Sequence, residues 1–545
     1  MTMQGGLTRL REELASARYP LSLPGAAEAR SLTKSMSGQL GDYLIPRLAR
    51  LDAPLLAVAG GSTGAGKSTL VNSLVGDTVS VASARRPTTR APVLVCHPSD
   101  EAWFREGKLL PDLSLRIIAS QAIAQGLALL DAPDIDSVEE ANRVLAEQLM
   151  AAADLWLFVT TAVRYADAVP WEVLADARTR GTSLAMVLNR VPPGADGEVL
   201  PHLQEMLAEH GLGTTKLFVV GEQALAPGGL LPAAAIAPLR TWLETLAQDA
   251  VARAAVVRQT VQGAIAALGP STLKLAAEAD AQAEAINALA ESVDIAYREA
   301  GSEVAHGVED GTLFRGEVLA RWQELVGTGE FMRGVQAAVG RWRDRVVSAI
   351  TGKPRPTEQL QNALETGLVT FVHSAATDAA ERATKAWRAH PAGAGLLRPE
   401  LAEASSDIDE RADRVVRDWQ RGVVELVREE SGKKLYYAKA GAYAANALAV
   451  TLMIVVFAAT AFIPTGAEIA VGAGTAVAAQ KVLEAIFGDE AVRRLATQAR
   501  RDLLTRVDAL LAEEAARFRK VLDSSGVDSG AGDRLRAAAA KVAAA

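Results

Sequence analysis

Two patterns of apolar residues divide the chain near residue 248. Before that point, short continuous apolar runs alternate with stretches of helical spacing, and sixteen of the 22 prolines occur there. The apolar runs predict buried strands at residues 54–60, 92–97, 127–131, 153–159, 183–189 and 216–220. The stretches between them predict helices near residues 67–75, 138–151, 169–179, 197–210 and 235–247. Because buried strands joined by helices are typical of βαβ units, this pattern predicts an α/β domain with a mainly parallel sheet.

After residue 248 the spacing of apolar residues is helical throughout. In residues 408–427 and 492–522, apolar side chains recur every three or four positions, over more turns than an ordinary globular helix has. This pattern predicts a long all-α bundle or stalk. The predicted domains are two N-terminal helices that pack on the bundle (1–52), the α/β domain (53–247), a helical stalk (248–432), an apolar hairpin (433–488), a returning stalk helix (489–522) and a flexible tail (523–545).

A phosphate-binding loop is predicted where residues 61–69 read GSTGAGKST, which fits the pattern G-x-x-x-x-G-K-[ST]. The segment follows a predicted strand and begins a predicted helix, which is the context that this motif requires. The glycines let the backbone wrap around the β-phosphate, Lys67 reaches the β and γ oxygens, and Ser68 offers a hydroxyl to Mg²⁺. The predicted nucleotide-binding residues of the loop are Gly61, Ser62, Thr63, Gly64, Ala65, Gly66, Lys67, Ser68 and Thr69.

Two further segments suit the same site. The predicted strand at 127–131 ends in Asp131, whose carboxylate fits the second magnesium position and would hold the ion through water. Residues 83–92 read SARRPTTRAP, where Thr88 or Thr89 is a candidate to close on Mg²⁺ and the γ-phosphate as a switch. The pattern leaves the choice between the two threonines open. The expected catalytic residues are Lys67, Thr88, Thr89 and Asp131, and the expected magnesium ligands are Ser68, Thr89 and Asp131.

These motifs resemble the GTPase domain of the bacterial branch of the dynamin-like family, over roughly residues 54–222. The resemblance rests on the segments GGSTGAGKST, RRPTT and LLDAPDIDS, and the helical remainder with its apolar segment is similar to the family's layout. It implies hydrolysis of GTP with Mg²⁺, nucleotide-linked self-association through the GTPase domains, and tethering or remodelling of a lipid bilayer. A related GTPase is a further candidate partner.

Three positions depart from the family pattern. Asp134 stands where the third motif usually has a glycine, whose N–H meets the γ-phosphate. The base-reading motif, normally N/T-K-x-D, reads NRVP at residues 189–192. Asn189 and the stem of Arg190 are expected to contact the base, but the aspartate that pairs with guanine is missing, so a preference for GTP over ATP rests mainly on the resemblance. Thr63 stands where eukaryotic members have a catalytic glutamine, which predicts slow hydrolysis or activation by a partner.

An apolar segment without charge extends from Ala440 to Ala467. A helix over residues 440–463 would be about 36 Å long at about 1.5 Å per residue, enough to cross a hydrocarbon core of roughly 30 Å. A second apolar stretch, Ile469–Gln480, follows a Pro-Thr-Gly turn signal. The flanking basic residues are Lys433, Lys434, Lys439, Lys481, Arg493 and Arg494. We therefore predict a hairpin inserted from the cytoplasmic face of a bacterial membrane. The alternative is an apolar hairpin buried inside the helical bundle or in an oligomer.

Composition and charge argue against two other kinds of function. The formal net charge of −8 argues against a general nucleic-acid binder, and a single cysteine with six scattered histidines argues against a zinc site. The sequence therefore predicts a dynamin-like GTPase that couples GTP hydrolysis to membrane binding. The alternative is a nucleotide-gated, membrane-associated scaffold with little hydrolysis. A membrane-anchored ATPase is the third hypothesis.

Overall fold

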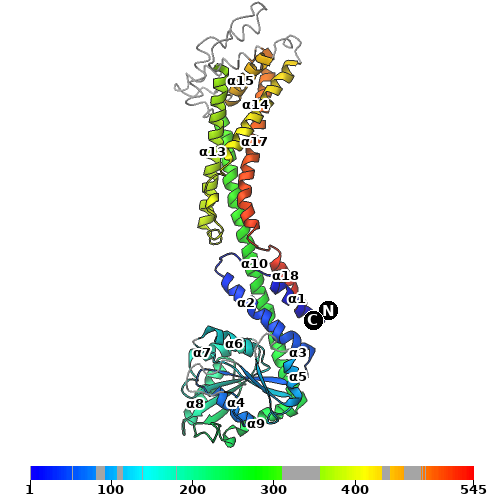
Figure 1. The fold of residues 1–545 in the computed structure, drawn as a ribbon, viewed down its shortest axis with the longest axis vertical. Helices are drawn as coiled ribbons and strands as arrows, with labels where there is room; N and C mark the ends of the chain where they lie inside the picture. Colours follow the sequence, from blue (N-terminus) through cyan, green and yellow to red (C-terminus); the bar gives the residue numbers. More distant parts are fainter. Residues whose placement is uncertain are drawn as a thin grey trace, which may run out of the picture. The chain divides into compact units, whose positions relative to one another are not determined.

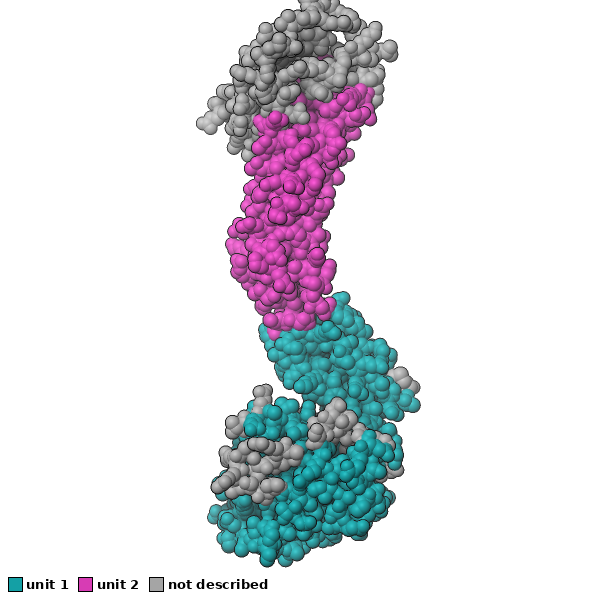
Figure 2. Space-filling view, in the orientation of Figure 1, with its two compact units in different colours: residues 1–19, 24–282, 528–545 teal, residues 20–23, 283–527 magenta. Residues whose placement is uncertain are grey.

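The computed structural model describes residues 2–51, 53–80, 92–106, 115–137, 139–179, 181–309, 356–432, 442–458, 480, 483–484 and 486–545. These residues divide into two compact units (Figure 2). Unit 1 consists of residues 1–19, 24–282 and 528–545, and unit 2 consists of residues 20–23 and 283–527.

Unit 1 contains the sheet that Figure 1 draws as arrows. This sheet has seven strands in the order β3-β2-β4-β1-β5-β6-β7. Its strands are β1 (Leu55–Gly61), β2 (Val93–Cys96), β3 (Arg116–Ala119), β4 (Leu127–Asp131), β5 (Leu155–Thr161), β6 (Ser183–Val191) and β7 (Lys216–Gly221). The sheet is mainly parallel, as predicted, because only β2 and β4 pair antiparallel within the described residues. All six predicted strands are present. The seventh, β3, was missed because its four residues form too short an apolar run and none of their side chains is fully buried.

Helices surround this sheet, and five of the six named next have bounds close to the predicted ones, whereas the short helix Glu101–Arg105 was not predicted. They are α4 (Lys67–Val75), α5 (Glu101–Arg105), α6 (Glu140–Ala151), α7 (Ala168–Thr179), α8 (Asp196–Glu209) and α9 (Ala233–Gln248). A core of strand side chains such as Ala57, Leu129 and Val159 packs against α4 and α9. The register pairs Ala59 with Asp131, so the carboxyl ends of β1 and β4 meet at one edge of the sheet. Ligands of open α/β sheets bind at this edge.

The two ends of the chain also belong to unit 1. The N-terminal part forms α1 (Met3–Ser16), α2 (Ala26–Gln39), a π-helical turn (Leu40–Leu44) and α3 (Ile45–Ala49). The prediction of a flexible tail at 523–545 was wrong, because residues Ala531–Ala543 form the helix α18, which packs on α1. The apolar stripe of α18 is short and rich in alanine, so it gave little signal. The N-terminal helices lie in the unit that contains the sheet. They do contact the start of the predicted stalk, because Glu28 of α2 pairs with Lys274 at 2.6 Å.

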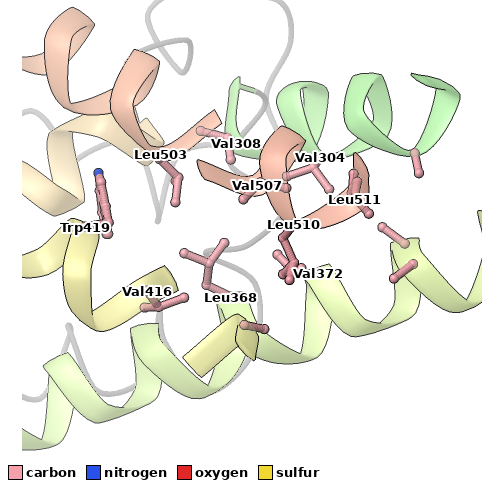
Figure 3. Close-up of a cluster of buried hydrophobic side chains, with 14 of the residues drawn as sticks. Val304, Val308, Leu368, Val372, Val416, Trp419, Leu503, Val507, Leu510 and Leu511 are labelled. Atoms are coloured by element: carbon pink, nitrogen blue, oxygen red, sulfur yellow. The ribbon is translucent and has the colours of Figure 1, made fainter. Parts of the chain in front are cut away.

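Unit 2 is a helical bundle, as predicted. It is built from α13 (Pro356–Ala389), α14 (Ile408–Gly432), α15 (Ala442–Ala458), α17 (Asp489–Asp523) and the last part of α10 (Ala250–Glu309). Figure 3 shows how Val304, Leu368, Val416 and Leu510 from four of these helices meet in one core. Trp419 of α14 also donates its indole N–H to a carbonyl of α17 at 2.8 Å.

The described part of the predicted membrane arm lies inside this bundle. Every residue from Ala449 to Phe457 on α15 is buried, and α15 packs against α14, α17 and α13. Phe457 meets Trp419 edge to face at 5.6 Å, and Arg500 of α17 donates to the carbonyl of Val456 at 2.8 Å. A helix that is apolar on all sides suits a protein core as well as lipid. This stretch therefore agrees with the predicted alternative, burial inside the helical bundle, and not with the first arm of a membrane hairpin.

Across the described residues, no helix combines the length and the apolar character needed to cross a bilayer. Of the predicted hairpin, residues 433–441, 459–479, 481–482 and 485 lie outside those residues.

Candidate nucleotide-binding site

The predicted phosphate loop connects the end of β1 to the start of α4, and two of its glycines are required by close backbone approaches. Gly61 has φ 145°, and a Cβ there would lie 2.0 Å from the carbonyl oxygen of Val159 on β5. Gly66 has φ 91°, and a Cβ there would lie 2.5 Å from Nδ2 of Asn189. A side chain at either position would collide with its neighbour and adopt an unfavourable backbone conformation. The loop is therefore shaped by backbone geometry, as its sequence predicts.

Lys67 is the buried cation of this loop. It begins α4, where the N–H groups of the first turn are free to bind an anion. Its side chain is only 5% exposed. The ammonium donates to the carbonyl oxygens of Gly61 at 2.9 Å and Ser62 at 3.0 Å, and it forms an ion pair with the carboxylate of Asp134. Lys67 thus lies where the phosphates of a nucleotide would lie, with its ammonium bound to these three acceptors.

Asp131 ends β4 and is fully buried beside the loop. Burial raises the pKa of this carboxyl, while hydrogen bonds from Ser80 and Ser68 and the charge of Lys67 oppose the rise, which places all three beside Asp131. The Ser80 hydroxyl donates to Oδ2 at 2.5 Å. Oδ1 is buried and has no hydrogen-bond partner among the described residues.

This arrangement fits a magnesium ion. An unpartnered buried carboxylate oxygen and the nearby Ser68 hydroxyl are the hard oxygen donors that Mg²⁺ prefers, together with water and phosphate oxygens. Ser68 and Asp131, both predicted from sequence, are therefore brought together. Thr88 and Thr89, the predicted switch residues, lie outside the described residues.

A second acidic residue, Asp136, ties the loop after β4 to the phosphate loop. Its carboxylate accepts hydrogen bonds from the backbone N–H of Thr63 at 2.6 Å and from the Thr63 hydroxyl at 2.7 Å. Arg164, just after β5, donates to Asp136 at 2.9 Å and to the carbonyl of Thr63 at 2.9 Å. Burial alone would raise the pKa of Asp136, but the hydrogen bonds from Thr63 and Arg164 outweigh it and hold the pKa below its ordinary value.

Sequence reasoning missed Asp136 and Arg164 as site residues. One signal was present for both, because each follows the end of a predicted strand, and the carboxyl ends of parallel strands converge at one edge of a sheet. Nothing in the sequence, however, indicates that these two loops pair with each other across Thr63.

The base-reading segment lies at the end of β6. Asn189 is buried, donates from Nδ2 to the carbonyl of Ala65 at 2.8 Å and accepts the N–H of Arg190 at 2.9 Å. Arg190 has φ 54°, the left-handed region that non-glycine residues rarely adopt. Asn189 therefore joins the base-reading segment to the phosphate loop, and the strained residue beside it is the predicted cover for the base.

Comparison with known proteins identifies this region. A family model described as "50S ribosome-binding GTPase" matches residues 57–190. GTPase Era from Stenotrophomonas maltophilia (strain R551-3) is 33% identical over 156 residues, which is 27% of this chain and 44% of Era. Residues 57–190 form a P-loop GTPase domain. The prediction of a GTP hydrolase is thereby confirmed for this domain, and the predicted Mg²⁺ is consistent with the buried carboxylate oxygen of Asp131.

Solved structures similar to the chain cover different parts of it. Era from Aquifex aeolicus bound to GDP and AlF4⁻ has a TM-score of 0.25 at 23% identity, covering 35% of this chain and 56% of Era. A bacterial dynamin pair, described as providing a mechanism for long-range sensing and tethering of membranes, has a TM-score of 0.41 at 10% identity, covering 99% of this chain and 95% of that one. The chain spans less than half the length of the curated relative that it matches.

Proposed function

We propose that the chain is a dynamin-like GTPase that couples GTP binding and hydrolysis to binding, tethering or remodelling of a membrane at its cytoplasmic face. One observation carries this proposal. Helix α10 (Ala250–Glu309) is continuous over 60 residues, and it supplies residues both to the unit that holds the nucleotide site and to the helical bundle. Because one helix belongs to both units, a rearrangement at the nucleotide site has a route along the chain into the bundle.

The start of α10 is fastened to the sheet inside unit 1. The Thr260 hydroxyl donates to the backbone carbonyl of Asp154 at 2.9 Å and accepts the N–H of Ser183 at 3.0 Å. Gly181 leaves room for this contact, since a Cβ there would lie 2.5 Å from the Cα of Gly263. These contacts bind α10 to the beginnings of β5 and β6, strands whose other ends carry Arg164 and Asn189 at the nucleotide site.

The membrane part of the proposal rests on residues 459–479. Glu468 is the only charged residue of this segment, and basic residues flank the wider hairpin at Lys433, Lys434, Lys439 and Lys481. Such a segment beside basic residues is typical of a part that enters lipid from the cytoplasmic side. Because α15 is part of the protein core, we assign membrane contact to the residues that follow it.

A liposome experiment tests this assignment. Residues 459–479 are replaced by a Gly/Ser linker of equal length, which leaves α15 and α17 intact. We expect co-sedimentation with anionic liposomes to fall at least about tenfold, because burial of several apolar side chains in lipid is lost. Binding of mant-GDP should equal that of the unchanged protein, which shows that the GTPase domain is still folded. Undiminished co-sedimentation would contradict the membrane proposal while leaving the GTPase domain unaffected.

A nucleotide-gated scaffold is the second candidate. Two contacts favour it. Lys67, which would act on the γ-phosphate, is paired with Asp134, and Thr63, which stands at the position of the catalytic glutamine, is hydrogen-bonded to Asp136. Turnover of GTP measured with and without liposomes separates the two functions. Stimulation by liposomes supports the first, and nucleotide-dependent assembly with negligible turnover under both conditions supports the second. Self-association through the GTPase domains, a related GTPase as partner and the absence of nucleic-acid binding are parts of the same proposal.

A further inference from the structure

The ammonium of Lys67 has no donor left for a phosphate in this structure. A lysine side chain carries three N–H donors. The three donors of Lys67 are directed to the carbonyl oxygens of Gly61 and Ser62 and to Oδ1 of Asp134. In P-loop proteins this lysine contacts the β- and γ-phosphates. A nucleotide must therefore take the place of at least one of these acceptors, and Asp134 is the one that carries a charge.

The two residues that follow Asp134 also hold its loop against the phosphate loop. Ile135 is buried and donates its N–H to the carbonyl of Gly61 at 3.4 Å. The next residue, Asp136, accepts the two hydrogen bonds from Thr63. Asp134 itself is 25% exposed, while Lys67 is 5% exposed. A pair that is largely withdrawn from water interacts more strongly than an exposed one, so this contact competes effectively with a ligand.

We propose that Asp134 is an internal competitor for the P-loop lysine that weakens binding of the triphosphate more than that of the diphosphate. The γ-phosphate adds negative charge on the same ammonium that the Asp134 carboxylate occupies. The two anions repel each other if both remain, so GTP binding requires this loop to move away. GDP lacks the γ-phosphate and is penalised less.

This arrangement gives the loop after β4 a role that the usual glycine does not provide. A glycine at this position offers an N–H to the γ-phosphate and is drawn toward it. An aspartate is repelled from it, so the loop moves outward when the triphosphate enters, and the hydrogen bonds between Asp136 and Thr63 are placed under strain. The inference depends on the GTPase domain alone and stands or falls independently of the membrane proposal.

The test measures affinity for both nucleotides in the full-length protein. Wild type, Asp134→Asn and Asp134→Gly are titrated with fluorescent mant-GDP and with a non-hydrolysable mant-labelled GTP analogue, each with Mg²⁺. Asparagine keeps the size of the side chain and removes the charge. We expect both variants to bind the triphosphate about tenfold more tightly and the diphosphate less than about threefold more tightly, as expected for the loss of one nearby like charge.

A matched control removes a carboxylate elsewhere in the same domain. Asp77 follows α4, is exposed and accepts the N–H of Thr78, so Asp77→Asn changes the domain's net charge equally without touching Lys67. Its ratio of triphosphate to diphosphate affinity should equal that of wild type. The proposal is overturned if Asp134→Asn leaves the ratio unchanged, or if it weakens triphosphate binding, which would mean that Asp134 positions Lys67 for the nucleotide.

Discussion

Replacing Lys67 with alanine should weaken binding of both GDP and GTP by at least about 100-fold. The side chain is 5% exposed and supplies a positive charge at the phosphate loop from inside the protein. Its removal leaves the carboxylates of Asp131 and Asp134 facing any phosphate without this counter-charge. The measurement is equilibrium titration with mant-GDP and with a mant-labelled GTP analogue in the presence of Mg²⁺.

An exposed lysine supplies the control for this prediction. Lys274 on α10 is 61% exposed and pairs with Glu28, which is 66% exposed. Lys274→Ala removes the same charge from the chain and should leave both affinities within about twofold. A loss of less than about tenfold for Lys67→Ala would mean that the phosphates are bound mainly by backbone N–H groups, and the role assigned to the lysine would be wrong.

The phosphate loop could be predicted from the sequence because its backbone conformation restricts which residues can occupy it. Gly61 and Gly66 have conformations and neighbours that only glycine tolerates, and Lys67 begins the helix that the motif requires. Each of these structural requirements is met by one residue type at a fixed position in the motif, so the sequence reveals it. Asp131 was predicted similarly, from its place at the end of a buried strand, and the structure brings its carboxylate beside Ser68.

The contacts of Asp134, Asp136 and Arg164 could not be predicted in the same way. They arise where loops from β4 and β5 meet the phosphate loop, and the separation of Arg164 from Asp136 along the chain carries no information about that meeting. The sequence did mark Asp134 as unusual. It indicated that the usual glycine contact with the γ-phosphate is missing, whereas the partner that the structure provides for Asp134 is Lys67.

The location of α15 shows that hydropathy alone cannot distinguish a buried core helix from a helix in lipid. Ala449 to Phe457 have the same apolar character whether helices or lipid surround them, so the sequence left both interpretations open. The choice depends on the surfaces of other helices, here Trp419 of α14 and Arg500 of α17. The tail helix α18 was missed for a related reason, because its stripe of small residues becomes a core only where α1 covers it.

Replacing Asp154 with alanine should destabilise the sheet by about 3–5 kcal/mol. Asp154 is fully buried and its carboxylate accepts hydrogen bonds from the Arg47 guanidinium, from the Tyr43 hydroxyl at 3.0 Å and from the N–H of Leu56 at 2.8 Å. Arg47 is also fully buried. Without Asp154 its charge would stay in the interior uncompensated, which is the costly way to break a buried pair. Burial already raises the pKa of Tyr43, so this hydroxyl cannot supply a counter-charge by ionising.

Hydrogen exchange measured by mass spectrometry localises this effect. Peptides covering β1 and β5 should exchange at least about 100-fold faster in Asp154→Ala than in wild type, since about 1.4 kcal/mol corresponds to a factor of ten. Glu28→Ala, which breaks an exposed pair, should leave the same peptides unchanged. The double variant Arg47→Met with Asp154→Leu should recover most of the loss, because an apolar pair leaves no buried charge. If it exchanges as fast as Asp154→Ala, the hydrogen bonds to Tyr43 and Leu56, rather than the unpaired charge, hold the N-terminal helices to the sheet.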